Sequence, residues 1–336
     1  MKTTKNTSVW SRGLAALLAI VCVLSLAVGA FAQAPEEQKF VMTYPEDMQA
    51  LGFTEPLVLD SVPQRIVCLS AAPVLALYEM GAKLVGIPSS RVVSWPEDLV
   101  AATKPVQFSA MSSSDFDYEC IVELEADLVL VGSSSTEVGE QIESLGIPVY
   151  YVFAGHTVSH DNTKAQTEAL VNAFSLDEAS TAKGEEIMGR FTALEERLAS
   201  VQPTYADKKA MVLQSSDTAN HYIQTERGTL ASMAAMMGFG NVYENETSSM
   251  AKLDMEQALD YNPDLVLCVG GGTAEEHKAL MEQAFSENEA YWNSIDAIKN
   301  GNVIYLPVEF CSTAGIHVID KINELVDCIE AFYAEK

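Results

Sequence analysis

The sequence predicts an α/β protein with two Rossmann-like α/β sandwich lobes joined by one long rigid helix. Three observations carry this prediction. Short, continuously apolar runs alternate with helical segments in both halves of the chain, as expected for parallel strands covered on both faces. A single uninterrupted helical pattern separates the halves, and one spaced pattern of Asp and Glu occurs once in each half.

A secretion signal is predicted at the start of the chain. Basic residues precede an apolar run from Leu14 to Val28, and Ala30 and Ala32 place small residues at the cleavage positions. We expect residues 1–32 to be removed, so that the mature protein works in a periplasm or at the extracellular cell surface. An uncleaved membrane anchor is the alternative. Cys22 lies inside the apolar run, so lipidation is not predicted.

Composition excludes nucleic acid as a partner. The 336 residues include 47 Asp and Glu against 20 Lys and Arg, and a surface with a formal net charge of −27 repels nucleic acid. The chain after the signal is long enough for two lobes with cores of their own. Its cysteines are widely spaced without a C-x-x-C pattern, which predicts neither a disulfide framework nor a zinc cluster.

The predicted strands fall into one group in each half of the chain. They are Arg65–Ser70, Leu84–Ile87, Leu128–Val131 and Val149–Phe153, then Ala210–Gln214, Leu265–Val269 and Val303–Leu306. Because these runs are apolar throughout and do not alternate, both faces of each sheet are expected to be covered. Each half is therefore interpreted as an α/β sandwich.

The connecting helix is predicted over residues 177–201. Its apolar residues follow a 4-3-4-3 spacing, Asp177 is the expected N-cap, and Pro203 is the expected end. A helix of this length spans roughly 37 Å and would act as a stiff strut. A helix packed within one lobe is the alternative. The predicted division is a signal over 1–32, lobes over 33–176 and 203–336, and a helix over 177–202.

One internal repeat links the two halves. Asp117 and Glu119 are followed, after seven residues, by Asp127-Leu-Val-Leu. The second copy has the same spacing and consists of Asp254, Glu256 and Asp264. In each copy a carboxylate opens an amphipathic helix that leads into a strand, so related lobes would present Glu119 and Glu256 at equivalent corners. Such corners suit a two-fold partner with basic sockets. The alternative is that each acid only favours a helix N-terminus.

Several stretches, taken in order, carry a resemblance to a known family. They are Pro63–Ser70, Leu77–Gly81, Leu84–Ile87, Glu123–Leu130, Leu145–Val149, Met255–Leu259, Asn262–Val266 and Ile298–Tyr305. Together they resemble the substrate-binding proteins of ABC importers for vitamin B12, iron-siderophores and haem, whose lobes are joined by one rigid helix.

The resemblance implies a binding protein rather than an enzyme, with no catalytic cofactor. Its implied partners are a small-molecule ligand and an ABC permease dimer with its ATPase, and we expect a monomer. In that family a glutamate on each lobe docks onto arginines of the permease. Glu119 and Glu256 match those positions.

The C-terminal half is most similar to the haem-binding lipoproteins of Gram-positive bacteria, which favours haem as the transported ligand. Those proteins hold the iron between a methionine of the first lobe and a histidine of the second. Met111 falls near the methionine position, with about three extra residues before the docking glutamate. Gly271 occupies the histidine position, which departs from the family pattern.

In an open α/β sheet the ligand lies outside the carboxyl ends of the strands, so we expect a ligand cleft between the lobes, lined by the loops after the strands. Haem requires iron ligands and cationic partners for its propionates. The candidate iron ligands are Met111, His156, Cys311 and His317; the remaining candidate contacts are Arg91, Arg227 and Tyr222. Each candidate also has an ordinary structural role as its alternative: a core residue for Met111, solvated side chains for His156 and His317, a buried inert thiol for Cys311, and surface ion pairs for Arg91 and Arg227.

Other functions remain open at this point. A siderophore or cobalamin would fit the same family, although a catecholate chelate favours a basic cleft and the chain is poor in arginine. The dispersed histidines do not favour a receptor for a bare metal ion. An extracellular thiol hydrolase, with Cys311 as nucleophile and His317 as base, lacks any activating signature around either residue.

Overall fold

The computed structural model describes residues 39–89, 93–107, 114, 116–154, 160–245, 247–311 and 313–336. Residues 41–59 and 63–336 belong to one compact unit, and the described residues 39–40 and 60–62 belong to a second, small one. The two large sheets and the cavities lie in the larger unit. The predicted signal, Arg91, Met111 and His156 fall outside the described residues.

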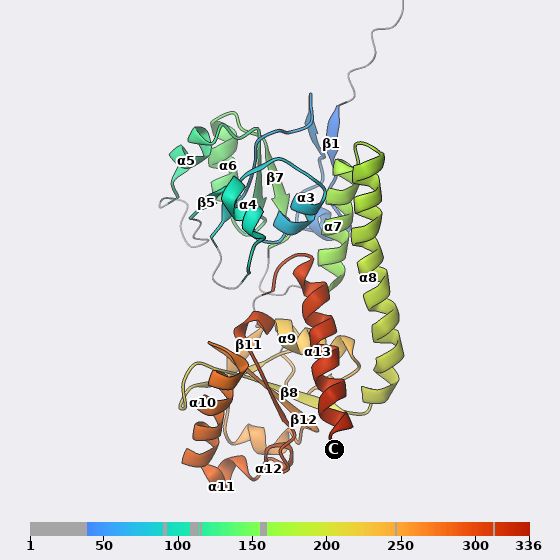
Figure 1. The fold of residues 1–336 in the computed structure, drawn as a ribbon. Helices are drawn as coiled ribbons and strands as arrows, with labels where there is room; N and C mark the ends of the chain where they lie inside the picture. Colours follow the sequence, from blue (N-terminus) through green and yellow to red (C-terminus); the bar gives the residue numbers. More distant parts are fainter. Residues whose placement is uncertain are drawn as a thin grey trace, which may run out of the picture. The chain divides into compact units, whose positions relative to one another are not determined.

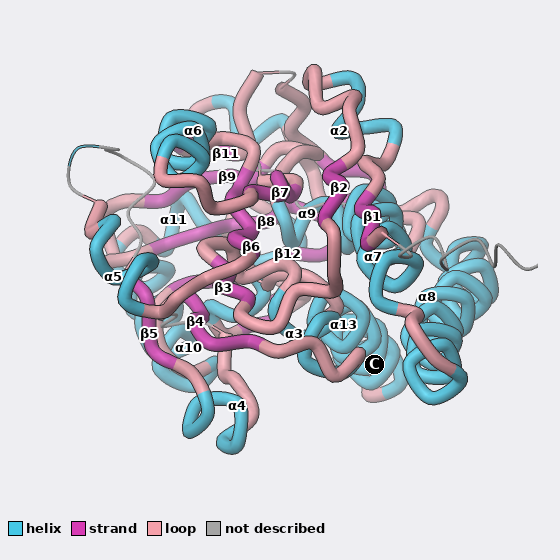
Figure 2. Tube along the Cα trace, turned by 90° about the horizontal axis from the view of Figure 1, so that it is seen from above, coloured by secondary structure: helices cyan, strands magenta, loops and turns pink. Residues whose placement is uncertain are grey.

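The first large sheet has five parallel strands in the order β5-β4-β3-β6-β7 (Figure 2). Its strands are β3 (Ile66–Cys68), β4 (Leu84–Pro88), β5 (Lys104–Val106), β6 (Leu128–Gly132) and β7 (Val149–Val152). The helices of this lobe are α3 (Val74–Glu79), α4 (Glu97–Ala102), α5 (Tyr118–Glu123), α6 (Thr136–Ser144) and α7 (His160–Phe174). A small sheet of β1 (Phe40–Met42) and β2 (Leu57–Leu59), with α2 (Glu46–Ala50) between them in sequence, precedes it. All four strands predicted in this half are confirmed.

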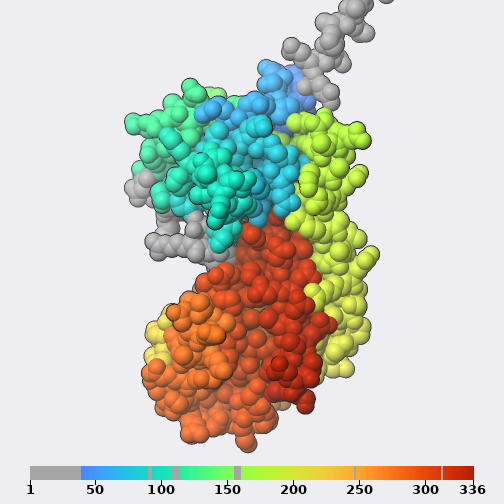
Figure 3. Space-filling view, viewed as in Figure 1, coloured from blue at the N-terminus to red at the C-terminus, as the bar shows by residue number. Residues whose placement is uncertain are grey.

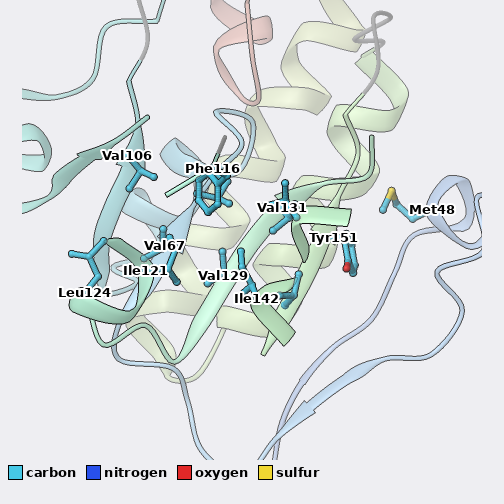
Figure 4. Packing of buried hydrophobic residues seen from close by; sticks show 13 residues of the cluster. Met48, Val67, Val106, Phe116, Ile121, Leu124, Val129, Val131, Ile142 and Tyr151 are labelled. Atoms are coloured by element: carbon cyan, nitrogen blue, oxygen red, sulfur yellow. The ribbon is translucent and has the colours of Figure 1, made fainter. Parts of the chain in front are cut away.

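A buried apolar cluster covers one face of this sheet (Figure 4). Val67, Val129 and Val131 come from the strands, while Ile121 of α5 and Ile142 of α6 pack against them. The alternate strand residues, such as Cys68 and Leu130, are also fully buried and therefore serve the other face. This two-sided burial explains the continuous apolar runs in the sequence.

The connecting helix is α8 (Glu178–Tyr205), and it begins as predicted. The Asp177 carboxylate caps it by accepting a hydrogen bond from the Ser180 amide at 2.8 Å. The predicted apolar stripe is buried along its whole length: Ile187, Phe191, Leu194, Leu198 and Val201. Lys164 of α7 pairs with Glu195 at 2.6 Å, so part of this stiff helix is fixed against its preceding neighbour.

The predicted end of this helix was wrong, because Pro203 lies inside it and the helix continues to Tyr205. Proline in a last turn removes only one backbone hydrogen bond, and its fixed φ is compatible with a helix. Tyr205 is buried and stacks on Phe239 with ring centroids 4.6 Å apart, which holds the last turn in place. The predicted lobe boundaries themselves stay a prediction.

The second large sheet has the order β11-β9-β8-β12-β13, with β10 beside β8. Its strands are β8 (Lys209–Ser215), β9 (His221–Gln224), β10 (Gly240–Asn241), β11 (Met250–Lys252), β12 (Leu265–Gly270) and β13 (Val303–Leu306). The three predicted strands β8, β12 and β13 are parallel neighbours, as expected. The sequence missed β9 and β11, which run antiparallel to their neighbours.

Helices accompany this sheet on opposite sides, with α10 and α13 flanking β8 and β12 in Figure 1. They are α9 (Thr229–Met236), η2 (Gln257–Asp260), α10 (Ala274–Glu287), α11 (Glu289–Trp292), α12 (Asp296–Lys299), η3 (Val308–Phe310) and α13 (His317–Ala334). In Figure 3 the surface of α13, in red, borders that of α8, in yellow-green. Arg197 of α8 joins them by donating to the Asn323 side chain at 2.9 Å. Among the described residues no helix is long and apolar enough to cross a membrane.

Candidate functional site

A cavity of ≈ 850 Å³ opens where the loops after two neighbouring strands meet. Strand β12 ends at Gly270 and β13 at Leu306, and the cavity wall begins within two residues of each end, at Gly272 and Pro307. This is the position expected for a ligand in an open α/β sheet. The lining residues are Val93, Ser94, Gly272, Thr273, Ala274, Glu276, Pro307, Val308, Glu309, Thr313, His317 and Lys321.

Three polar atoms from residues of this wall are buried without a hydrogen-bond partner among the described residues. They are Glu309 Oε2, Thr313 Oγ1 and His317 Nε2. An unpaired buried polar atom costs free energy, and native structures satisfy nearly all such atoms with protein, water or ligand. The three residues line the cavity, but these atoms are themselves buried, so an occupant contacts them only after neighbouring side chains shift.

His317 is the predicted iron-ligand candidate that lines this cavity. It is the first residue of α13, and its ring centroid lies 6.5 Å from that of Trp95. Burial lowers the pKa of His317, and Asp320 and a hydrogen bond with the backbone of Ser94 partly oppose this. The imidazole is therefore neutral at physiological pH, which is the state that ligates a metal.

Cys311 does not belong to the lining. Its thiol donates towards Gln214 Oε1 at 3.5 Å and accepts from Gln224 Nε2 at 3.3 Å, within a group of side chains at the β8 and β9 edge. Burial raises the pKa of Cys311 to about 12, with the Gln224 hydrogen bond opposing. The thiol is thus protonated, whereas the nucleophile and metal ligand is the thiolate.

Two further candidates lie on the antiparallel strand that the sequence missed or directly after it. Tyr222, predicted in a loop, is in β9, where it is 37% exposed; Arg227 is exposed in the following turn. The segment from His221 to Gln224 carries no apolar run, so the strand gave no signal by itself. Neither Tyr222 nor Arg227 is among the described residues that line the large cavity.

Two charged side chains of the wall, Glu276 and Lys321, already have partners. Glu276 forms a capping box with Thr273, whose amide donates to Glu276 Oε2 at 2.8 Å, and these Thr273 bonds lower the pKa of Glu276. Lys321 pairs with Glu324 at 2.6 Å and lies 5.0 Å from the centre of the Phe310 ring. Lys321 is the one lysine or arginine of the described lining, and its ammonium group already pairs with Glu324 instead of an anionic ligand.

Sequence reasoning missed Glu309 and Thr313 as individual contacts. Both follow the predicted strand Val303–Leu306, and the loops after the strands were expected to line the cleft, but their residue types are common on surfaces. Only the burial of their oxygens singles them out, and burial depends on the packing of η3 and α13. No spacing pattern in the sequence could have found them.

The internal repeat is also a structural repeat, and we call Asp117–Asp127 and Asp254–Asp264 the acidic corners. In the first, Asp117 Oδ1 accepts from the amides of Glu119 and Cys120 at 3.1 and 3.3 Å. In the second, Asp254 Oδ1 accepts from the amides of Glu256 and Gln257 at 2.9 and 3.1 Å. The glutamate is exposed in both corners.

The backbone conformation and hydrogen bonds of the two acidic corners also match further along the chain. Glu125 and Asn262, at matching positions, both have positive φ, 48° and 42°. The closing aspartates then accept hydrogen bonds from the backbone where the neighbouring strand begins: Asp127 from the amide of Arg65 at 2.8 Å, and Asp264 from the amide of Lys209 at 2.7 Å. One expectation was wrong, because the second corner contains the short 3-10 helix η2 where an amphipathic α-helix was predicted.

The family follows from a match over most of the chain. A profile of the periplasmic binding proteins matches residues 66–309, which include both large sheets and both acidic corners. The chain belongs to this family. As a periplasmic binding protein it binds a ligand and is not an enzyme, as predicted. Among the solved structures that it resembles, IsdE of Staphylococcus aureus is complexed with haem and the siderophore-binding protein FhuD of Vibrio cholerae is bound to Fe3+-Desferal.

Individual relatives are distant from this periplasmic binding protein. The high-affinity heme uptake system protein IsdE of Staphylococcus aureus is 26% identical over 118 residues, which are 35% of this chain and 39% of that protein. The chain thus matches well under half the length of this curated relative.

Solved structures share the fold at lower identity. The iron uptake ABC transporter substrate-binding protein PiuA of Streptococcus pneumoniae has a TM-score of 0.65 at 21% identity, covering 87% of this chain and 99% of that one. The vitamin B12 binding protein BtuF of Vibrio cholerae has a TM-score of 0.61 at 17% identity, covering 82% and 99%. These likenesses establish two α/β lobes with a long helix as the fold.

Proposed function

We propose that the protein is the exported substrate-binding component of an ABC importer, and that it captures haem in the large cavity. His317 carries the proposal, because its neutral imidazole lines a cavity of ≈ 850 Å³ and its Nε2, buried in the present side-chain arrangement, has no partner among the described residues. Histidine is a common axial ligand of haem iron, and this volume lies in the range of pockets for drug-sized ligands. The partial match to IsdE supports the same ligand.

The electrostatics of the wall support haem over an anionic siderophore. Glu276 and Glu309 lie in the lining, and its described cation, Lys321, is already paired. A catecholate chelate of high negative charge would be repelled by such a wall. Haem has a largely apolar face, and its propionates can remain at the open side of a cavity. Arg91, which lies outside the described residues, is the proposed partner of the propionates.

Cobalamin is the second candidate, and the oxygens of Glu309 and Thr313 favour it. Both are unpartnered acceptors in the wall, and the peripheral amides of a corrin ring provide N–H donors. Cobalamin would place its amides against these atoms, whereas haem would leave them to bridging water. Titration with both ligands therefore separates the two candidates.

The test of the proposed ligand is a visible absorption titration of the mature protein with haem. We expect a saturable shift of the Soret band, with affinity lowered at least about 100-fold in His317→Ala and partly restored by free imidazole. Cys311→Ala is the matched control and should bind like wild type. Met111→Ala and His156→Ala examine the second axial position. Absence of a saturable shift, together with saturable binding of cobalamin, would reject haem.

Delivery is proposed to occur through the acidic corners, with Glu119 and Glu256 docking onto basic sockets of the permease dimer. The exposed glutamates, held in matching geometry by Asp117 and Asp254, support this role. We expect Glu119→Ala with Glu256→Ala to leave ligand affinity unchanged and to abolish uptake in cells. Uptake at the normal rate in this double variant would remove the docking proposal. Export by the predicted signal and a monomeric state complete the proposal.

A further inference from the structure

Each acidic corner exposes one large apolar side chain at the same distance from its glutamate. Val122 is 53% exposed and Leu259 is 46% exposed, and each follows its glutamate by three residues. Single exposed apolar residues are ordinary on protein surfaces. However, an exposed apolar side chain occurs at the matching position of both acidic corners, although their local sequences differ. The general frequency of exposed apolar residues does not explain this coincidence.

The backbone places each glutamate and its apolar neighbour on one side. Residues three apart share a face of an α-helix and nearly eclipse in a 3-10 helix, which describes α5 and η2 respectively. The residue just before each apolar position, Ile121 or Ala258, is fully buried and fixes the opposite side. Each corner therefore presents an acid beside an apolar side chain, even though the two helices differ in type.

We propose that Val122 and Leu259 are the apolar half of the permease docking surface, which deepens the proposed importer function and depends on it. The partner is a pair of equivalent permease subunits, each with a basic socket bordered by apolar side chains. The glutamates supply charge complementarity and salt-dependent steering. Val122 and Leu259 supply affinity that does not depend on salt, by removing apolar surface from water.

The experiment measures binding of the full mature protein to its cognate permease–ATPase complex in nanodiscs, at low and high NaCl. Val122→Ser and Leu259→Ser should each weaken binding about fivefold, and about 25-fold together, with the salt dependence unchanged. Glu119→Gln with Glu256→Gln should weaken binding and flatten the salt dependence. Leu145→Ser and Leu176→Ser are matched controls, being 51% and 53% exposed outside the corners, and should bind like wild type.

The outcomes separate this inference from the proposed function. If the two glutamine substitutions weaken binding while the serine variants bind like wild type, the apolar surface is wrong and docking through the glutamates stands. If both sets bind like wild type, docking at the corners is wrong altogether. An equal loss in the Leu145 and Leu176 controls would also overturn the inference, since the effect would then not belong to the corners. Unchanged thermal unfolding of each variant verifies that its fold is intact.

Discussion

The two lobes are alike at their acidic corners and differ at their sheets. The first sheet is entirely parallel, whereas the second adds the antiparallel strands β9 and β11 at one edge. The three unpartnered atoms of the cavity wall, in Glu309, Thr313 and His317, all come from the C-terminal half. The repeated part thus fits a symmetric partner, and the part that is not repeated carries the ligand chemistry we propose.

The sharpest test of this difference compares one glycine from each lobe. A Cβ at Gly270, where β12 ends, would overlap the Ser215 carbonyl oxygen and the His277 ring, whereas one at Gly139 of α6 would meet only the end of the Tyr151 side chain. Gly270→Ala should cost about 3 kcal/mol, because a backbone neighbour cannot move aside, and Gly139→Ala about 1 kcal/mol. Urea denaturation measures both, and equal losses would contradict the argument.

The closing aspartates of the corners give the next largest effect. The Asp127 carboxylate accepts from two backbone amides, those of Gln64 at 2.7 Å and Arg65 at 2.8 Å, whereas the Asp264 carboxylate accepts from the backbone amide of Lys209 at 2.7 Å. We expect Asp127→Ala to lower the free energy of unfolding by about 2 kcal/mol and Asp264→Ala by about 1 kcal/mol.

Tryptophan fluorescence can assign these losses to a lobe. Trp95 lies in the first lobe and Trp292 in the core of the second, so Trp95→Phe and Trp292→Phe backgrounds each report one lobe. Asp127→Asn and Asp264→Asn keep an acceptor oxygen and serve as controls, with smaller losses in the free energy of unfolding. A larger loss for Asp264→Ala than for Asp127→Ala would contradict the expected order.

The smallest expected effect is a pH dependence confined to the second lobe. Burial lowers the pKa of His221, His277 and His317, and neither nitrogen of His277 has a partner among the described residues. The folded lobe therefore binds fewer protons than the unfolded chain once the pH falls below the unfolded pKa of about 6.5. Its stability is complete above that pH and declines below it, by at most about 1.4 kcal/mol per pH unit for each histidine.

Replacement of one buried histidine measures this dependence. His277→Leu keeps the buried volume apolar and should reduce the loss of stability between pH 7.5 and 5.5 by about 1 kcal/mol. Denaturation followed through Trp292 at both pH values provides the measurement. An unchanged pH dependence in His277→Leu would show that this imidazole does not oppose acid unfolding.

The sequence predicted those features that depend on local patterns. The apolar runs located seven strands, the Asp177 cap and the buried stripe located α8, and the spacing of Asp117, Glu119 and Asp127 located a repeat that the structure reproduces. The sequence did not predict strand β9, because an antiparallel strand with a side chain exposed to solvent, here Tyr222, needs no continuous apolar run. The end of α8 was predicted wrongly at Pro203, because a helix can continue past a proline when its last turn is held in place, here by the stacking of Tyr205 on Phe239.

By itself, then, the sequence determined the two α/β halves, the helix between them and the paired acidic corners, because period, capping and spacing act over a few residues. Only the tertiary structure decided which candidates line the large cavity. His317 lines it and Cys311 does not, and Glu309 and Thr313 join it. The physical reason is that burial and the loss of hydrogen-bond partners arise from segments far apart in the chain, and no local pattern encodes them.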